Sequence, residues 1–314
     1  MPAKLIFDTD MGNDIDDALA LALIHSLQNR GECELLALTI SKDHPETVPY
    51  VDAINTFYGR ADIPLGIVKG GATPEQSRFT HIALQTSDGN YVYPHSAILG
   101  EPVPDAVSLL RKTLADQSDG SVVVVAVGFS TNLRRLLESS GDEHSSLAGV
   151  DLVGTKVQFL SIMAGAFEPI RGNTHLEYNI VNDIASAQFV AEHWPTRVVW
   201  SGFEIGLAIR YPAVSIDRDF RYRRRHPIAE SYQAYIPTPH ERPTWDLTSV
   251  LYAVRPDREY FKLSETGQVI VKEDGETIFD PDLEGLHVHL QLDTDNVSQL
   301  RELFATLVSE PPKV

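Results

Sequence analysis

The sequence predicts an α/β fold: one large domain with a mostly parallel central sheet that helices cover on both faces. Short apolar runs alternate with helical patterns along most of the chain, and parallel sheets have this order of elements. The run 122–127 is apolar throughout and rich in valine, as strands buried on both faces are. Because the sequence has neither an internal repeat nor a break in composition, we expect residues 1–314 to form a single domain.

The first part of the chain begins with a predicted strand at residues 4–7. Residues 18–27 are apolar on nearly all sides, which indicates a helix buried against the sheet. Residues 34–40 are the second predicted strand. A helix follows at 48–58, entered through Pro45, a residue that a first helical turn allows.

The middle of the chain repeats this alternation. The predicted strands are 122–127, 157–163 and 197–200, and the predicted helices are 133–137 and 184–192. Open sheets of this kind bind their ligands at the carboxyl ends of the strands, so we expect the functional residues there.

Two long polar stretches interrupt the alternation, at 78–95 and 214–244. Both contain aromatic residues and prolines, and long irregular loops often cover a binding site. We therefore expect active-site loops at both places. Short strands within 265–290 and a closing helix at 296–308 complete the prediction.

The charge of the chain argues against some classes of protein. Aspartate and glutamate number 44 against 26 lysines and arginines, a formal net charge of −18, so a nucleic-acid polymer is not an expected partner. Cys33 has no second cysteine to pair with, which fits a reducing compartment. Acidic residues interrupt the first apolar segment, and no run approaches about 18 apolar residues. We expect a cytoplasmic protein without a membrane partner.

The segment after the first strand carries five carboxylates in ten residues: Asp8, Asp10, Asp14, Asp16 and Asp17. Crowded carboxylates repel one another, whereas a hard divalent cation accepts several of their oxygens at once. Helix capping would explain Asp14, Asp16 and Asp17, but it leaves Asp8 and Asp10 unexplained. We therefore predict a metal or catalytic site in this segment.

The stretch IFDTDMGNDIDDALAL resembles the N-terminal signature of the nucleoside hydrolases, the inosine-uridine preferring family, whose usual form is D-x-D-x-G-x-D-D-A. This sequence carries two extra residues before the paired acids. If the loop bulges outward there, Asp16 and Asp17 take the place of the pair and Asp14 is an added acid. In the other register, Asp14 takes one of the two roles.

Three later stretches resemble the same family in the same order, so the similarity runs from about residue 4 to about residue 256. Residues 125–132 (VAVGFSTN) resemble the segment whose threonine offers a backbone carbonyl to the metal. Residues 163–179 (MAGAFEPIRGNTHLEYN) resemble the glycine-rich segment that ends in a ribose clamp. Residues 242–253 (RPTWDLTSVLYA) resemble the helix start that brings the last metal carboxylate.

This resemblance implies calcium-dependent hydrolysis of the N-glycosidic bond of a small-molecule ribonucleoside, to ribose and free base. It assigns the Ca2+ ion to Asp10, Asp17, Asp246 and the backbone carbonyl of Thr131. Asp10 is then also the base that activates the attacking water. Family members are commonly dimers or tetramers, and we expect a homodimer or homotetramer here.

The resemblance also implies contacts with the substrate. It places Asp16 and Asn179 at the 2′ and 3′ hydroxyls, Asn173 and Glu177 at the 5′ hydroxyl, and Met163 and Trp245 against the nucleoside. From the residues alone, Asn173 after a glycine is a turn asparagine, and Thr131 is a helix cap. Glu177 and Asn179 stand at alternate positions, so they would share one face of an extended segment.

The sequence departs from the family where the leaving base is handled. Trp245 stands where purine-preferring members often have a histidine, and an indole cannot protonate a base at neutral pH. Three residues of the upstream loop are candidates for stacking or proton donation: Tyr232, Tyr235 and His240. Three others follow the second strand, where the family usually has an asparagine near the ribose: Lys42, Asp43 and His44.

Two other functions remain open from the residues alone. A strand followed by Asp-x-Asp also begins phosphatases of the haloacid-dehalogenase type, in which Asp8 would be the nucleophile, Asp10 the acid and base, and magnesium the metal. A non-catalytic, calcium-dependent nucleoside or sugar binder could carry the same acidic loop. Assays of phosphate release and of ribose release separate the three hypotheses.

Overall fold

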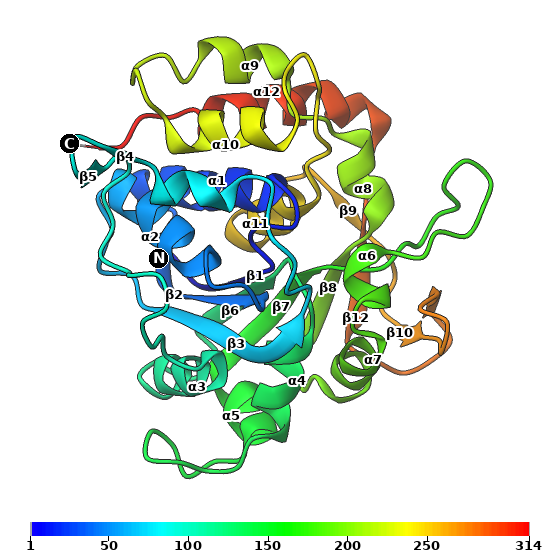
Figure 1. Cartoon of the computed structure of the whole chain (residues 1–314). Coiled ribbons are helices and arrows are strands. Elements are labelled where there is room, and N and C mark those ends of the chain that lie inside the picture. The colour runs from blue at the N-terminus through cyan, green and yellow to red at the C-terminus, as the bar shows by residue number, and fades with distance from the viewer. Residues whose placement is uncertain (1, 314) are drawn as a thin grey trace.

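A computed structural model describes residues 2–313, and its centre is an eight-stranded sheet (Figure 1). Its strands are β1 (Ala3–Thr9), β2 (Cys33–Lys42), β3 (Leu65–Ala72), β6 (Val122–Ala126), β7 (Val157–Met163), β8 (Arg197–Ser201), β9 (Lys262–Leu263) and β12 (His287–Gln291). They lie in the order β3-β2-β1-β6-β7-β8-β12-β9. Neighbouring strands are parallel except β12 and the edge strand β9. The predicted, mostly parallel α/β sheet is confirmed.

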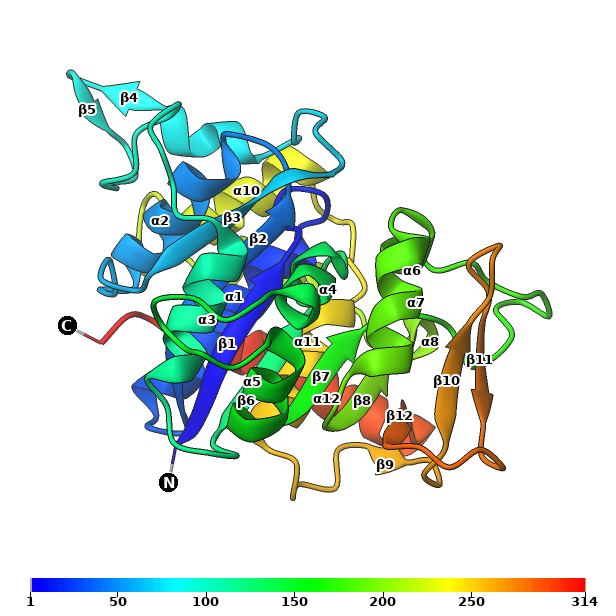
Figure 2. The same ribbon diagram turned by 90° about the horizontal axis from the view of Figure 1, so that it is seen from below.

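Helices cover both faces of this sheet (Figure 1, Figure 2). One face carries α1 (Asp16–Asn29), α2 (Thr47–Phe57), α10 (Pro227–Tyr235), α11 (Trp245–Val254) and α12 (Val297–Val308). The other face carries α3 (Ala106–Ala115), α4 (Thr131–Glu138), α5 (Gly149–Lys156) and α7 (Ile184–His193). Within residues 2–313, no helix combines the length and the apolar character that crossing a membrane requires.

The side chains of β1 show how the sheet serves two cores. Leu5 and Phe7 pack into the core that includes α1, α2 and α11, whereas Ile6 packs into the core that includes α3, α4 and α5. All three side chains are fully buried. The valines of β6 alternate between the two cores in the same way. An unbroken apolar run therefore marks these strands, because neither of their faces meets water.

Shorter elements connect these layers. They are η1 (Thr80–Leu84), β4 (Thr86–Ser87), β5 (Asn90–Tyr91), α6 (Tyr178–Val181), α8 (Phe203–Ala208), α9 (Ala213–Arg218), β10 (Gln268–Val271), β11 (Thr277–Asp280) and η2 (Thr294–Asn296). The pairs β4–β5 and β10–β11 are antiparallel hairpins outside the main sheet. Figure 2 shows β10–β11 beside α7. The strands predicted within 265–290 correspond to β10, β11 and β12, and of these β12 alone joins the main sheet, next to β8.

The two long polar stretches differ from the prediction. Residues 214–244 are not an irregular loop, because most of α9 and all of α10 lie within them. Residues 78–95 contain η1 and the hairpin β4–β5. The helix predicted at 48–58 begins at Thr47, so Pro45 precedes it and does not belong to its first turn.

The start of α10 shows what the sequence prediction overlooked. Pro227 is the first helical residue, and the His226 side chain accepts a hydrogen bond from Ile228 N (3.2 Å) through Nδ1. A capping side chain followed by proline is a signal for a helix start. The polar, arginine-rich residues before it hid that signal.

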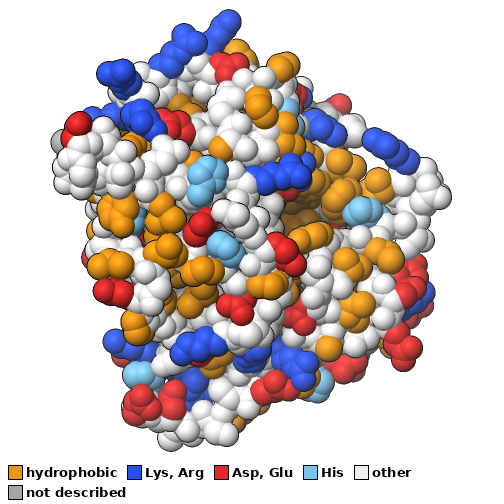
Figure 3. Space-filling model, in the orientation of Figure 1, with side chains coloured by type: hydrophobic (Ala, Val, Ile, Leu, Met, Phe, Trp, Pro, Cys, Tyr) orange, Lys and Arg blue, Asp and Glu red, His pale blue; other side chains and the backbone are white. Residues whose placement is uncertain are grey.

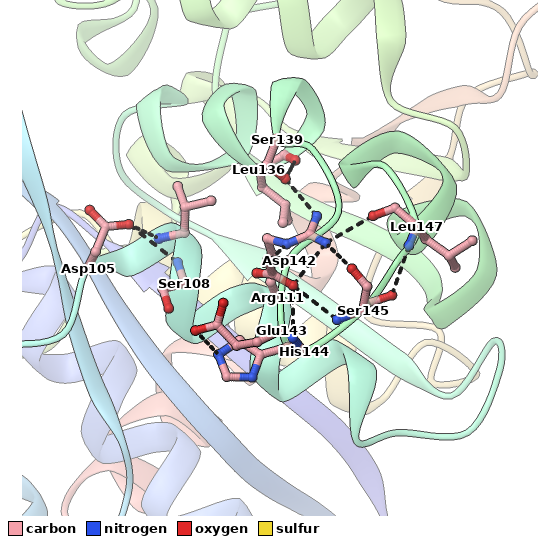
Figure 4. Close-up of polar contacts among 11 residues, drawn as sticks. Asp105, Ser108, Arg111, Leu136, Ser139, Asp142, Glu143, His144, Ser145 and Leu147 are labelled. Carbon is pink, nitrogen blue, oxygen red and sulfur yellow. Dashed lines mark hydrogen bonds and ion pairs between the residues drawn. The ribbon is translucent and has the colours of Figure 1, made fainter.

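Arg111 of α3 holds the loop that follows α4 (Figure 4). Its guanidinium donates to Asp142 through Nε (2.8 Å) and Nη2 (3.2 Å), and its side chain is only 3% exposed. Nη2 also donates to the backbone oxygens of Ser145 and Leu147, each at 2.9 Å. These bonds hold the pKa of Asp142 at about 2, well below its usual range. The network lies at the carboxyl end of α4, so it anchors the fold away from the acidic segment.

Candidate active site

A cavity of about 430 Å³ opens at the carboxyl ends of the central strands, a size typical of small-molecule sites. Figure 3 shows a hollow to the right of centre on this face, with hydrophobic side chains inside it. Ten residues that the sequence singles out line the cavity: Asp10, Asp14, Asp16, Asp17, Met163, Glu177, Asn179, Tyr235, Trp245 and Asp246. Eight others do not line it: Asp8, Lys42, Asp43, His44, Thr131, Asn173, Tyr232 and His240.

Three carboxylates form the floor of the cavity. Asp16 and Asp17 begin α1, Asp246 lies in the first turn of α11, and one oxygen from each lies within 4.8 Å of the others. Each side chain is at most 4% exposed, and burial, followed by neighbouring carboxylates, raises each pKa well above its usual range. A hard divalent cation would bind these oxygens and offset the cost of burying their charge. The donor set therefore fits calcium.

The same geometry bears on the alternatives for the acidic segment. The residue before α1 is Ile15, and no side chain caps this helix, so capping does not account for the acids. The cluster contains Asp16 and Asp17 but not Asp14. Asp16 Oδ2 accepts a hydrogen bond from Asp246 N (3.2 Å), and Thr9 donates to Asp17. The extra residues thus place Asp14 outside the paired acids.

Asp10 lies beside this floor and is held by Asn13, which Lys42 holds in turn. Asn13 Nδ2 donates to Asp10 Oδ2 (2.7 Å), and Lys42 Nζ donates to Asn13 Oδ1 (2.8 Å). Burial raises the pKa of Asp10 to about 6, although the bond from Asn13 opposes the rise. No side chain within residues 2–313 donates to Oδ1 of Asp10, so this oxygen is available to a ligand. Sequence reasoning missed Asn13, because nothing in the loop distinguishes it.

A glycine allows the loop after β6 to reach Asp10. A Cβ on Gly128 would lie 2.4 Å from Asp10 N, closer than any real side chain permits. This close approach brings the end of β6 against the end of β1. The absence of a side chain at Gly128 thereby lets the loop after β6 pack against the backbone of Asp10.

Asp8 lies beneath the cavity. Its Oδ2 accepts hydrogen bonds from Thr39 Oγ1 (2.5 Å) and Asn132 Nδ2 (2.8 Å), and it is fully buried. Burial raises its pKa to about 7. Because its carboxylate does not border the cavity, it cannot attack a substrate there. The haloacid-dehalogenase hypothesis, which makes Asp8 the nucleophile, is therefore wrong.

Thr131 is the first residue of α4 and does not line the cavity. Its hydroxyl donates to Asp183 Oδ2, and both residues line a separate surface pocket. No side chain caps α4, so Thr131 is not the helix cap that the pattern suggests. The expected role of its backbone carbonyl as a metal ligand stays a prediction.

Glu177 and Asn179 lie at the start of a helix, not on an extended segment as expected. Glu177 is the N-cap of α6 and accepts hydrogen bonds from Asn179 N (2.8 Å), Ile180 N (3.1 Å) and Gly165 N (3.2 Å). Burial raises its pKa to about 7, against the effect of these bonds. Asn179 Nδ2 donates to the backbone oxygens of Val127 (3.0 Å) and Met163 (3.1 Å). Its Oδ1 is thus left to contact a ligand in the cavity.

Asn173 is exposed in a turn, where its Nδ2 donates to Arg171 O (3.3 Å). It behaves as the turn asparagine that the residues alone suggest, and the structure does not bring it to the cavity. His175 lines the cavity instead, and sequence reasoning missed it. Its ring lies against Phe203, with 3.8 Å between the centroids, and burial lowers its pKa.

An aromatic wall stands above the acidic floor. The rings of Phe203 and Trp245 lie 5.1 Å apart at 30° to each other, and Trp245 Nε1 donates to Phe203 O (2.9 Å). Gly206 allows this packing, since a Cβ there would lie 2.3 Å from Trp245 Cα. The indole N–H is therefore already used, so Trp245 offers a ligand in the cavity its apolar ring and no proton.

Of the candidates in the upstream loop, Tyr235 alone lines the cavity. The Tyr232 hydroxyl accepts a hydrogen bond from Arg242 N (2.8 Å) and donates to His240 O (3.0 Å), so it holds the loop. Both ring nitrogens of His240 lie buried without a partner among residues 2–313. After β2, Asp43 accepts a bond from Gly71 N (3.1 Å) and His44 from Glu46 N (3.3 Å). These four residues have structural contacts, not cavity contacts.

Arg242 is a third cavity residue that sequence reasoning missed, after Asn13 and His175. It forms a bidentate ion pair with Asp14, with Nε 2.8 Å from Oδ1 and Nη2 bound to Oδ2. Its position four residues before Asp246 was visible in the sequence, but its partner Asp14 lies 228 residues away. A pairing over that distance leaves no local pattern.

An acidic, cation-binding floor under an aromatic wall, at the strand ends of a parallel sheet, is the site of an α/β enzyme that acts on a small molecule. The model of the inosine-uridine preferring nucleoside hydrolase family matches residues 5–302. The chain belongs to this metal-dependent family, which confirms the resemblance inferred from its four motifs.

Individual relatives agree with this assignment. The pyrimidine-specific ribonucleoside hydrolase RihA of Salmonella dublin is 31% identical over 230 residues, which are 69% of this chain and 66% of that protein. The match thus spans just under two thirds of the relative's length. A purine-preferring ribonucleoside hydrolase from Gardnerella vaginalis shares the fold with a TM-score of 0.72 at 19% identity, over 98% of both chains. An inosine-uridine preferring nucleoside hydrolase from Bacillus anthracis gives 0.70 at 17%, over 97% of this chain and 99% of that one.

Proposed function

We propose that this protein hydrolyses the N-glycosidic bond of ribonucleosides, giving ribose and the free base, and that it needs calcium. The observation that carries the proposal is the floor of the cavity, where Asp16, Asp17 and Asp246 converge within 4.8 Å. Family membership supplies the reaction class. The base preference stays open, because one relative is named for pyrimidines and another for purines.

The calcium ion would be held by Asp10, Asp17, Asp246 and the backbone carbonyl of Thr131, with Asp16 beside it. Bound there, calcium would lower the pKa of a water molecule and take up the ribose hydroxyls. Asp10 accepts the proton of the attacking water through Oδ1, since its Oδ2 is engaged by Asn13. The surrounding carboxylates stabilise the positive charge that develops on the ribose.

The ribose would lie on this floor, with polar residues around its hydroxyls. Asp16 and Asn179 Oδ1 can bind the 2′ and 3′ hydroxyls, and Glu177 the 5′ hydroxyl. The nucleobase then points toward Trp245 and Tyr235, the apolar side of the cavity. Such a site rejects a sugar that lacks a hydroxyl, because its buried polar partner is left unpaired.

The decisive experiment is a reducing-sugar assay on inosine, uridine, adenosine and cytidine, with calcium and with a chelator. We expect ribose release that needs calcium and that Asp10→Asn lowers by about 10²–10⁴-fold. Asp151→Asn, an exposed acid on α5, is the matched control and keeps full activity. If the native protein binds calcium and nucleoside but releases no ribose, it is a binder and the hydrolase proposal fails.

We further propose a cytoplasmic homodimer or homotetramer. Cys33 is 3% exposed and burial raises the pKa of its thiol to about 12, so it is an inert core residue, as a reducing compartment allows. Light scattering after size-exclusion chromatography measures the assembly, and a monomeric mass at micromolar concentration would contradict it.

A further inference from the structure

We propose that Arg242 is a catalytic residue that stabilises the negative charge on the departing base, and that Asp14 is the positioning residue that aims it. This inference rests on the proposed hydrolase function and concerns its leaving-group step. The step lacks an obvious acid, because Trp245 cannot donate a proton and its indole N–H is bound to Phe203 O.

Arg242 is fixed at three points, two on its guanidinium and one on its backbone. Nε and Nη2 bind the two oxygens of Asp14, a fork that sets the plane of the group as well as its distance. The backbone N of the same residue donates to the Tyr232 hydroxyl (2.8 Å). Asp14 does not belong to the carboxylate cluster of Asp16, Asp17 and Asp246. The ion pair with Arg242 would therefore explain why the loop carries two extra residues before Asp16.

The fixed guanidinium borders the part of the cavity into which the nucleobase would project. Its Cζ is 5.1 Å from the Trp245 ring centroid and 5.2 Å from that of Tyr235, and all three residues line the cavity. The Arg242 side chain remains 23% exposed, so it can reach a ligand in the cavity. With the ribose on the acidic floor, a base that projects toward Trp245 and Tyr235 would lie within reach of the guanidinium.

One nitrogen of Arg242 is free to bind the base. Asp14 takes Nε and Nη2, and no acceptor within residues 2–313 binds Nη1. The Tyr232 hydroxyl is not free in the same way, since it bonds to His240 O (3.0 Å). Nη1 is therefore a charge-assisted donor, suited to a carbonyl oxygen or ring nitrogen of a base.

The step that we propose balances without a protein acid. The oxygen of water forms a bond to C1′ and its proton goes to Asp10, while the C1′–N bond breaks and its electron pair stays on the base. The resulting anionic base spreads its charge to the acceptor atom that Nη1 of Arg242 binds. As the base leaves, the proton held by Asp10 passes to it through solvent water, which restores the Asp10 carboxylate and yields the neutral base and ribose.

The test compares leaving groups. Uridine and inosine need help with the departing charge, whereas 4-nitrophenyl β-D-ribofuranoside does not, because its nitro group already delocalises the charge. We expect Arg242→Met to lower kcat/KM for the nucleosides by about 100-fold and for the aryl riboside by less than about threefold. Asp14→Asn also lowers kcat/KM for the nucleosides relative to kcat/KM for the aryl riboside, and Asp14→Glu restores this ratio in part.

Two further variants complete the design. Arg210→Met removes an exposed arginine whose backbone bridges to Pro243, and it leaves both substrates unaffected. Arg242→Lys keeps the charge without the fork. If Arg242→Met fails to fold, Arg242→Lys is used for the test. We expect it to lower kcat/KM by about tenfold or more for the nucleosides and not for the aryl riboside.

The outcomes separate the possible explanations. An equal loss on nucleosides and aryl riboside overturns the inference, because Arg242 would then act on the ribose or the fold. A nucleoside-only loss in His175→Gln, with Arg242→Met unaffected, assigns the role to His175 and also overturns it. If the wild-type protein cleaves neither substrate, the proposed hydrolase function itself fails.

Discussion

Lys42 donates a hydrogen bond from Nζ to Asn13 Oδ1 at 2.8 Å, although its side chain lies almost entirely inside the protein. The ammonium also binds Thr73 O at 2.6 Å. Because the Asn13 oxygen faces Lys42, its Nδ2 must face Asp10, where it donates to Oδ2 at 2.7 Å. The buried lysine thus determines which group Asn13 presents to the proposed base.

Replacing this lysine should therefore affect the reaction more than binding. In Lys42→Met the Asn13 amide is free to turn and present its oxygen to Asp10, which would displace that carboxylate. We expect kcat to fall about tenfold with KM within about twofold. Lys69→Met, an exposed lysine on β3, is the control. Steady-state kinetics on uridine and inosine measure the effect, and an unchanged kcat would show that Asn13 needs no such partner.

The acidic floor predicts opposite effects of one mutation with and without calcium. Asp246→Asn removes one of three crowded, buried carboxylates, so in chelator the variant should melt no lower than the wild type. With calcium about 100-fold above its Kd, the free energy of unfolding of the wild type rises by about 2.7 kcal/mol, and that of the variant rises far less. Thermal melts of both proteins, with exposed Asp257→Asn as control, measure this crossover. A calcium shift as large in the variant as in the wild type would rule out Asp246 as a ligand.

Two asparagines of one segment should differ sharply. Asn173 lies exposed in a turn, so Asn173→Ala should keep kcat/KM for uridine within about twofold, as surface changes usually do. Asn179 lines the cavity and donates to Val127 O and Met163 O. We therefore expect Asn179→Ala to lower kcat/KM for uridine at least about tenfold. Equal losses in the two variants would mean that the turn closes over bound substrate.

Glu204 predicts a pH dependence of stability away from the site. Burial raises its pKa from 4.5 to about 7, so the folded protein binds more protons than the unfolded chain between these values. The free energy of unfolding contributed by this group therefore falls as pH rises through that window. Glu204→Gln should melt about 2 °C or more above the wild type at pH 8 and show no gain at pH 4. Exposed Glu192→Gln is the control, and a gain that is the same at both pH values would contradict the assignment.

The main sheet was predictable from the sequence because its strands are buried on both faces. The run at 157–163 coincides with β7, and the run at 122–127 differs from β6 by one residue. The strand β3 was not predicted, since its second half contains Lys69 and two glycines and is partly exposed. The helices α3 and α5 were missed as well, although Asp105 caps α3 through bonds to Val107 N and Ser108 N.

The acidic part of the site was predictable because its residues cluster in one loop and match a family signature. The structure brings Asp16, Asp17 and Asp246 together as that signature implies. The cationic part was not predictable, because Lys42 and Arg242 act through partners in other segments. Sequence spacing reveals residues that act from one turn or strand end, and it conceals those that meet only in the fold.

The place of β12 in the sheet has a consequence for biosynthesis. This strand comes from residues 287–291 yet pairs with β8, so a nascent chain that ends before His287 presents β8 as an open edge. Such a chain already contains all the acids of the floor, but its sheet can still add a strand from a neighbouring polypeptide. Chains that stall late on the ribosome, or that lose their last 30 or so residues to a protease, would therefore aggregate while retaining every residue of the proposed chemistry.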